Sequence, residues 1–198
     1  MAEILAIGDA RDNADLLVNC RDLGYINPDD RVLDMTYGLG RFWAKWRPEN
    51  LVANDLHPEK GEVHFDWTSP FDPDIGYFDV VVFDPPYKLN GTGGSHASDE
   101  AYGVDWSYRS IEDKHDAMRR GLGMGRRMLD QNGRLLVKCM DQVSSGRVQW
   151  QTLLMADHAK GLGLRLVDML HLVGHRKQPP GRRQMHARRN YSTLMVFQ

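Results

Sequence analysis

The residues with the clearest chemical character are Asp84, Pro85, Pro86 and Tyr87, which directly follow the apolar run 80–83. A short β-branched and aromatic run without polar residues is typical of a strand buried on both faces of a parallel sheet. The prolines cannot donate to a sheet ladder, so we expect the chain to leave the sheet at Asp84. Ligands of open α/β sheets bind beyond the carboxyl ends of the strands. The turn therefore presents a carboxylate and an aromatic ring where a ligand can reach them.

This Asp-Pro-Pro-Tyr turn resembles the catalytic motif of the S-adenosylmethionine-dependent methyltransferases that modify exocyclic amino groups of bases, chiefly adenine N6 or cytosine N4 in DNA. The resemblance implies that the target amine donates hydrogen bonds to the Asp84 carboxylate and the Pro85 carbonyl, which aims its lone pair at the methyl group. It also implies that Tyr87 stacks on a base flipped out of its duplex. For four residues taken alone, a plain exit from a strand into a loop is the alternative.

A second motif lies upstream, where the expected strand 31–36 runs into residues 37–42, here called the glycine turn. A strand, a glycine-rich turn and a helix together form a cradle for a nucleotide, because glycine lets the backbone approach a ligand closely. We expect the helix to continue to Trp46. The residues that resemble the cofactor-binding motif of the same methyltransferases are Asp34, Thr36, Gly38, Gly40 and Phe42. The resemblance implies that Asp34 faces the methionine amino group of the cofactor and that Phe42 packs near its adenosine.

Acidic residues also mark the next two expected strands, 51–55 and 63–67. Asp55 follows Asp34 by 21 positions, an offset at which a carboxylate can accept both ribose hydroxyls of a nucleoside. By the resemblance, Asp66 accepts the adenine amino group of the cofactor and Trp67 flanks the ring. The alternatives are a helix cap for Asp55 and ordinary core packing for Trp67.

Cationic residues are concentrated in the second part of the chain. Residues 1–118 contain 10 Lys or Arg and 23 Asp or Glu, whereas residues 119–198 contain 15 and 4, within a net charge of −2. Such asymmetry indicates a polyanion-binding face. We expect eight residues to contact nucleic acid: Lys88, Lys138, Arg176, Lys177, Arg182, Arg183, Arg188 and Arg189. Among them, Lys138 is expected beside the target base.

Two loops are the expected means of holding a target. Residues 88–109 combine four glycines with the aromatic side chains of Tyr102, Trp106 and Tyr108, as in a mobile lid that orders over a substrate. Residues 175–190 form an expected basic hairpin loop, in which residues 175–189 hold six Lys or Arg and no acid. A solvated insertion and a solvated hairpin are the respective alternatives.

The order and spacing of these motifs resemble class I methyltransferases with the gamma-type order, in which the cofactor motif precedes the catalytic motif. The resemblance implies an α/β, Rossmann-like fold with a seven-stranded, mostly parallel sheet, helices on both faces and an antiparallel last strand. Further helices are expected at 13–23, 111–129 and 147–160, and further strands at 134–140, 164–173 and 192–197. A single domain, 1–198, leaves no room for a separate target-recognition domain, so the loops or a partner must read the target.

Composition restricts the setting of the protein. Cys20 and Cys139 are the only cysteines, which offer neither a disulfide framework nor a zinc pattern and suit a reducing, cytoplasmic compartment. No metal site is expected. No run is long and apolar enough to span a membrane, and no signal peptide opens the chain.

The leading functional prediction is a DNA adenine-N6 methyltransferase with S-adenosylmethionine as its cofactor, because Asp as the first residue of the motif favours adenine in this resemblance. The first alternative is a methyltransferase that acts on RNA bases. The second is a catalytically silent, methyltransferase-like subunit that only binds nucleic acid. A homo-oligomer or a specificity partner is compatible with each. A nicotinamide dehydrogenase is disfavoured, because the third glycine of the dinucleotide fingerprint is missing.

Overall fold

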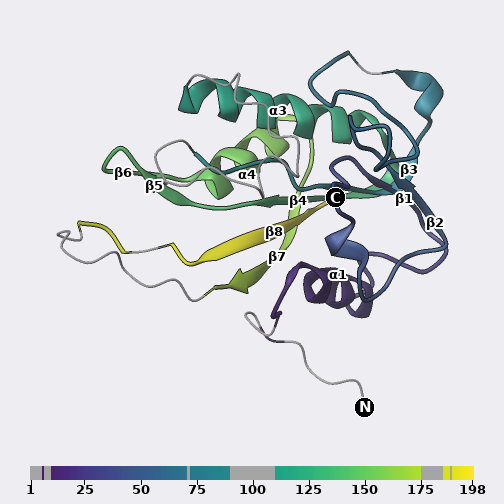
Figure 1. Cartoon of the computed structure of the whole chain (residues 1–198), viewed down its shortest axis with the longest axis horizontal. Helices are drawn as coiled ribbons and strands as arrows, with labels where there is room; N and C mark the ends of the chain where they lie inside the picture. The colour runs from purple at the N-terminus through teal and green to yellow at the C-terminus, as the bar shows by residue number, and fades with distance from the viewer. Residues whose placement is uncertain (1–5, 7–9, 71, 90–109, 175–184, 188) are drawn as a thin grey trace.

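A computed structural model describes residue 6 and residues 10–70, 72–89, 110–174, 185–187 and 189–198. Its main feature is a six-stranded sheet in the order β2-β1-β3-β4-β8-β7 (Figure 1). The strands are β1 (Arg31–Asp34), β2 (Asn50–Ala53), β3 (Phe78–Phe83), β4 (Leu129–Cys139), β7 (Leu166–Val173) and β8 (Tyr191–Phe197). β1 to β4 are mutually parallel, whereas β8 is antiparallel to both β4 and β7. The expectation of a mostly parallel sheet with an antiparallel last strand is confirmed.

Helices cover both faces of this sheet. They are α1 (Asn13–Asp22), α3 (Ile111–Arg127) and α4 (Gln151–Gly161), with α3 and α4 on one face and α1 on the other (Figure 1). Successive side chains of a strand point to opposite faces, and β3 serves both layers in this way. Its residue Val81 packs in the same core cluster as Met118 of α3, while Val80 and Val82 pack in the cluster that contains Leu16 of α1.

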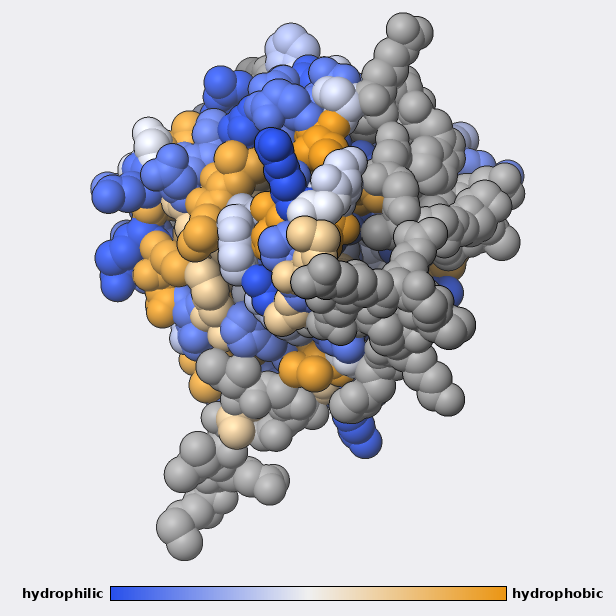
Figure 2. Space-filling model, turned by 90° about the vertical axis from the view of Figure 1, so that its left-hand side faces the viewer, coloured by the Kyte–Doolittle hydropathy of each residue, from blue (hydrophilic) through white to orange (hydrophobic). Residues whose placement is uncertain are grey.

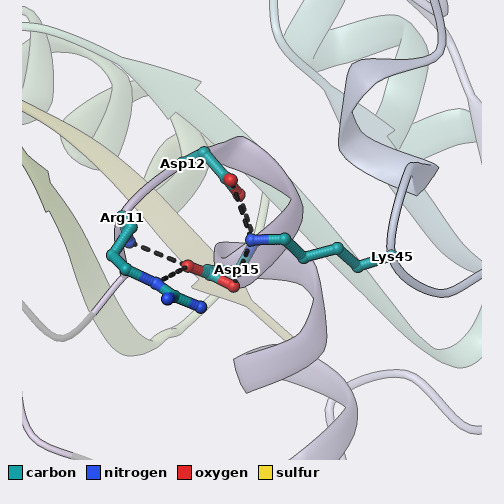
Figure 3. A network of polar contacts seen from close by, with 4 residues as sticks. All are labelled: Arg11, Asp12, Asp15 and Lys45. Atoms are coloured by element: carbon teal, nitrogen blue, oxygen red, sulfur yellow. Dashed lines mark hydrogen bonds and ion pairs between the residues drawn. The ribbon is translucent and has the colours of Figure 1, made fainter.

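Charged side chains tie the start of α1 to the segment that follows the glycine turn. Asp12 caps the helix, and its side chain accepts a hydrogen bond of 2.9 Å from the backbone amide of Asp15. The Lys45 ammonium lies 2.8 Å from the Asp12 carboxylate and 2.7 Å from that of Asp15 (Figure 3). Arg11 adds a second cation, 3.1 Å from Asp15. Asp12 and Asp15 thus hold Lys45, which lies 33 and 30 positions away from them in the chain.

The first correction concerns the number of strands, because the expected third strand, 63–67, is not part of the sheet, which has six strands and not seven. Only an isolated parallel bridge joins Val63 to Asn54. Beyond that bridge the Asn54 side chain replaces the backbone ladder: its amide donates to the Phe65 carbonyl at 3.1 Å, and its oxygen accepts from the Phe65 amide at 2.8 Å. The segment therefore lies beside the end of β2, where backbone hydrogen bonds of Val63 and the buried Asn54 side chain hold it.

Two expected helices also need correction. The glycine turn leads into a 3-10 turn, η1 (Arg41–Trp43), and not into a helix that reaches Trp46. So short a segment lacks the cooperative hydrogen bonds that stabilise an α-helix, and tertiary contacts hold Trp43 instead. The expected helix 147–160 begins only at Gln151, because the chain first forms a hairpin of β5 (Gln142–Ser144) and β6 (Arg147–Gln149). Ser145 and Gly146 turn this hairpin with φ angles of 50° and 73°, which match the geometry of two-residue hairpin loops.

The other expected elements are confirmed within a few residues of their ends, except that β4 begins earlier, at Leu129. Among the described residues, no helix has the length and apolar character needed to cross a membrane.

Candidate active site

The carboxyl ends of three neighbouring parallel strands bring the expected functional residues together. In register, Asp34 at the end of β1 pairs with Val82 of β3, and Phe83 of β3 pairs with Val137 of β4. Asp84 and Lys138 therefore follow directly at the same edge of the sheet. β4 runs towards the β5–β6 hairpin at the left-hand end of Figure 1. Figure 2 looks onto that end, where hydrophobic and hydrophilic side chains are interspersed.

Asp34 is a buried acid at the start of the glycine turn. Its carboxylate accepts hydrogen bonds from the Trp43 indole at 2.7 Å and from the Thr36 backbone amide at 2.9 Å. Burial raises the pKa of Asp34 to about 7, even though these two donors lower it. Sequence reasoning missed Trp43; the only signal was an indole N–H donor close to the turn, and such a donor needs a partner when it is buried.

Asp55 lies just beyond the end of β2 and fixes the shape of the glycine turn. Its carboxylate accepts hydrogen bonds from the backbone amides of Gly38 at 3.0 Å and His57 at 2.8 Å. Gly38 and Gly40 have φ angles of 58° and 63°, a conformation that favours glycine. A Cβ atom at Gly40 would also lie 2.7 Å from the Tyr37 hydroxyl. The two glycines are therefore required by the backbone of the turn itself.

Asp66 and Trp67 lie beyond the end of β2. The Asp66 carboxylate is exposed and accepts hydrogen bonds of 2.8 Å from both the backbone amide and the hydroxyl of Thr68. The Trp67 ring is half-buried and meets the Phe83 ring edge-on, with ring centroids 5.2 Å apart. A Cβ atom on Gly121 of α3 would also meet this ring, at 2.7 Å. Trp67 thus packs on the core, and contacts of either residue with a cofactor stay predictions.

The Asp-Pro-Pro-Tyr turn is built around Asp84 and Lys138. The Lys138 ammonium lies 3.4 Å from each Asp84 carboxylate oxygen and donates a 2.9 Å hydrogen bond to the Tyr87 hydroxyl. It also lies 5.0 Å from the centroid of the Tyr87 ring and 5.6 Å from that of Phe42. Burial raises the pKa of Asp84 and Lys138 opposes that rise, so this cation favours the ionised carboxylate.

Two buried amide side chains hold the far end of the turn. The Tyr87 carbonyl accepts hydrogen bonds from the side chains of Gln142 at 2.7 Å and Gln151 at 3.0 Å. The Gln142 oxygen in turn accepts from the Leu89 backbone amide at 3.2 Å. Sequence reasoning gave these glutamines no role. For Gln151, the signal was an amide on the otherwise apolar side of a helix, where a buried polar group needs a partner.

The expected nucleic-acid contacts are described only in part. Arg176, Lys177, Arg182, Arg183, Arg188 and lid residues 90–109 lie outside the described residues. Lys88 is exposed just after the Asp-Pro-Pro-Tyr turn, and the Lys88 carbonyl accepts a hydrogen bond from the Lys114 ammonium. The Arg189 guanidinium lies 4.6 Å from the centroid of the Trp150 ring. Lys138 is buried against Asp84, so its contact with a target base stays a prediction.

This sheet and its helices form the class I fold of S-adenosylmethionine-dependent methyltransferases. The N-methyltransferase NodS from Bradyrhizobium japonicum, solved with S-adenosylhomocysteine, is 14% identical with a TM-score of 0.54, over 93% of this chain and 84% of NodS. TrmN from Thermus thermophilus is 15% identical with a TM-score of 0.57, over 94% of this chain but 49% of TrmN. A precorrin-8w decarboxylase from Methanobacterium thermoautotrophicum is 16% identical with a TM-score of 0.52, over 92% of this chain and 88% of the decarboxylase.

At these identities the likeness establishes the fold. No family model matches the chain, and no curated protein matches its sequence.

Proposed function

We propose that the protein is an S-adenosylmethionine-dependent methyltransferase that acts on an exocyclic amino group of a nucleic-acid base, with adenine N6 in DNA as the target. The observation that carries this proposal is the position of the Asp84 carboxylate beside the glycine turn, where the Asp84 backbone amide donates a 2.8 Å hydrogen bond to the Thr36 hydroxyl. The class I fold supports the methyltransferase assignment.

The carboxylates beside the glycine turn, Asp34 and Asp55, fit the cofactor. When bound, S-adenosylmethionine supplies a methyl group on a cationic sulfur, together with an ammonium and two ribose hydroxyls. Asp34 is a buried acid with a raised pKa, and an ammonium beside it would favour its ionised form. Asp55 is half-buried, holds the Gly38 amide and suits the ribose hydroxyls. NodS, solved with S-adenosylhomocysteine, supports this assignment.

Asp84 suits the role of orienting an amine. Its side chain is 21% exposed, so part of the carboxylate is open while Lys138 contacts it from the protein interior. An amine whose N–H groups donate to the Asp84 carboxylate and the Pro85 carbonyl is held with its nitrogen lone pair directed away from them. Bound S-adenosylmethionine would supply the methyl group and leave as S-adenosylhomocysteine. The Asp84 carboxylate, which accepts the hydrogen bond of the amine, would take the proton that the nitrogen loses. Acceptors held in this way keep the amine in the reactive orientation, which a freely rotating amine adopts only part of the time.

A nucleic acid is the proposed partner because of the charge of residues 119–198, and the basic segment 175–189 is its proposed phosphate contact. We expect binding to duplex DNA to weaken with salt at a log–log slope of about −0.9 per phosphate neutralised. Replacing Arg182, Arg183, Arg188 and Arg189 by Ala should flatten that slope and weaken all sequences equally, since phosphate contacts carry no sequence information. An unchanged slope would assign phosphate binding to other residues.

The direct test is transfer of a labelled methyl group. The purified chain is incubated with labelled S-adenosylmethionine and, in parallel, duplex DNA, single-stranded DNA and RNA, after which each is digested and its nucleosides are identified. We expect label in N6-methyldeoxyadenosine. Label in RNA nucleosides would instead favour the RNA alternative. Absence of label from all three, with cofactor binding intact, would contradict the proposal.

Asp84→Ala separates chemistry from binding in the same assay. Since the carboxylate orients the amine, its removal should abolish transfer while calorimetric affinity for S-adenosylhomocysteine stays close to the parent value. Asp130→Ala is the matched control, because Asp130 is an exposed acid near the opposite end of the sheet. Transfer at a near-parent rate by Asp84→Ala would exclude the proposed role of this residue.

A further inference from the structure

Lys138 is a buried charged group of the candidate site. Its side chain is 3% exposed, against 21% for the Asp84 side chain. Its ammonium contacts both Asp84 oxygens at 3.4 Å and the Tyr87 hydroxyl at 2.9 Å. The rings of Phe42 and Tyr87 lie within 5.6 Å and 5.0 Å of it. Lys138 is therefore directed at the first and last residues of the Asp-Pro-Pro-Tyr turn and not at solvent.

A buried cation in this position has a definite electrostatic effect. A buried carboxylate is pushed towards its neutral form, and an opposite charge within about 4–6 Å pushes it back. A neutral Asp84 would offer a proton where the target amine needs an acceptor. Although burial lowers the pKa of Lys138, the charge of Asp84 and the hydrogen bonds to Asp84 and Tyr87 raise it above its ordinary value, so the lysine keeps its charge.

We propose that Lys138 is a positioning residue that keeps Asp84 ionised and fixes the Asp84 carboxylate and the Tyr87 ring in one geometry for the incoming amine. This role rests on the proposed function, because that function makes the Asp-Pro-Pro-Tyr turn, to which the ion pair belongs, the catalytic element. The pair is neutral as a whole, so it suits a neutral exocyclic amine better than a protonated alkyl amine. Lys138 acts through Asp84 and does not itself touch the reacting nitrogen.

Three other titratable groups, Asp34, Tyr87 and Cys139, interact with the Asp84–Lys138 pair. The Asp34 carboxylate, on β1, interacts unfavourably with the charge of Asp84, and this interaction raises the pKa of Asp34. Tyr87 on the turn itself and Cys139 on β4 have pKa values that burial raises above their ordinary values, so both stay neutral near pH 7. Asp34 is thus the group whose titration must be distinguished from that of Asp84.

The experiment is a carbon-13 titration of the aspartate carboxyl groups in the free protein, with the Asp84 and Asp34 signals assigned from Asp84→Asn and Asp34→Asn. In Lys138→Met we expect the Asp84 midpoint to rise by roughly 1–3 pH units. Lys138→Arg should restore the parent midpoint, and Lys160→Met, which removes an exposed lysine, should leave it unchanged. Because no nucleic acid is present, this readout is independent of whether the proposed substrate is correct.

Single-turnover methyl transfer against pH gives the second readout. In Lys138→Met the acid limb of the rate profile should move to higher pH together with the Asp84 midpoint, while affinity for S-adenosylhomocysteine stays within about twofold. Lys138→Gln, which can still donate to Tyr87, serves if Lys138→Met does not fold, and it should shift the midpoint equally. An Asp84 midpoint that stays at the parent value in a folded, uncharged variant overturns the inference. A shifted midpoint with an unshifted rate profile also overturns it.

Discussion

The Thr36 hydroxyl accepts a 2.8 Å hydrogen bond from the backbone amide of Asp84, and so joins two turns that lie 48 positions apart in the chain. The Thr36 backbone amide also donates to the Asp34 carboxylate at 2.9 Å. Thr36 therefore connects Asp34, which precedes the glycine turn, to Asp84, which begins the Asp-Pro-Pro-Tyr turn. Methyl transfer needs cofactor and amine in one fixed arrangement, and we expect this link to contribute to it.

Thr36→Val tests this link with almost no change of shape. The valine cannot accept the Asp84 amide, and an unsatisfied buried donor costs about 1–3 kcal/mol. We expect a lower transfer rate and a lower midpoint of thermal unfolding, with a smaller effect on cofactor affinity. Thr36→Ser keeps the hydroxyl and is the matched control. Equal rates in the valine and serine variants would show that the link does not matter for catalysis.

Cofactor binding should depend on pH through Asp34. Burial raises the pKa of this carboxyl to about 7, well above its ordinary value, so the acid is increasingly protonated below neutral pH. The ammonium group of the ligand favours the ionised form of Asp34, so affinity for S-adenosylhomocysteine should fall as the pH is lowered from 8 to 6. In that range binding should release the proton of Asp34. Calorimetry in two buffers of different ionisation enthalpy measures that proton. Asp34→Asn should remove the pH dependence; a dependence that persists in this variant assigns it to another group.

Asp55→Ala should weaken cofactor binding for two reasons. The variant loses the acceptor expected for the ribose hydroxyls, and it releases the backbone amides of Gly38 and His57. Removal of a charged acceptor typically costs about 1.5–3 kcal/mol, which is roughly a 10- to 150-fold loss of affinity. Asp130→Ala is the comparison, because it removes an exposed carboxylate near the opposite end of the sheet. Unchanged affinity in Asp55→Ala would move the ribose contact to another residue.

Lys45→Met should lower stability at neutral pH but not at low pH. The hydrogen bond from Lys45 is the largest cause that holds the pKa values of Asp12 and Asp15 below their ordinary 3.8. A depressed folded-state pKa contributes stability above the unfolded pKa, and this contribution disappears as the pH falls through the folded value. The unfolding midpoints of variant and parent should therefore differ at pH 7 and converge at acid pH. Added salt should also reduce the difference, since these side chains are partly exposed.

A difference of equal size at pH 7 and at acid pH would assign the effect of Lys45→Met to lost side-chain packing. Lys160→Met, which removes a lysine from the end of α4, controls for the general effect of the substitution.

Local patterns in the sequence were sufficient for most of the fold. The apolar runs that form β2 and β3 were predicted correctly, because a buried strand and its exit depend on a few consecutive residues. The segment 63–67 was wrongly predicted to be a strand, since the Asn54 side chain supplies the hydrogen bonds of Phe65 in place of a strand ladder. The hairpin before α4 was also missed, because a Ser-Gly turn can equally precede a helix.

The sequence by itself determined which residues are candidates for the chemistry: a carboxylate before two prolines, a turn that needs glycine, and an acid 21 positions after Asp34. Only the tertiary structure decided what surrounds them. Lys138 lies 54 positions from Asp84, and Gln151 lies 64 positions from Tyr87. Their contacts arise because β4 pairs with β3 in one register and α4 packs on the same face as α3. Periodicity along a chain gives the face of each element, whereas the neighbour of each element is set by the packing of the whole sheet.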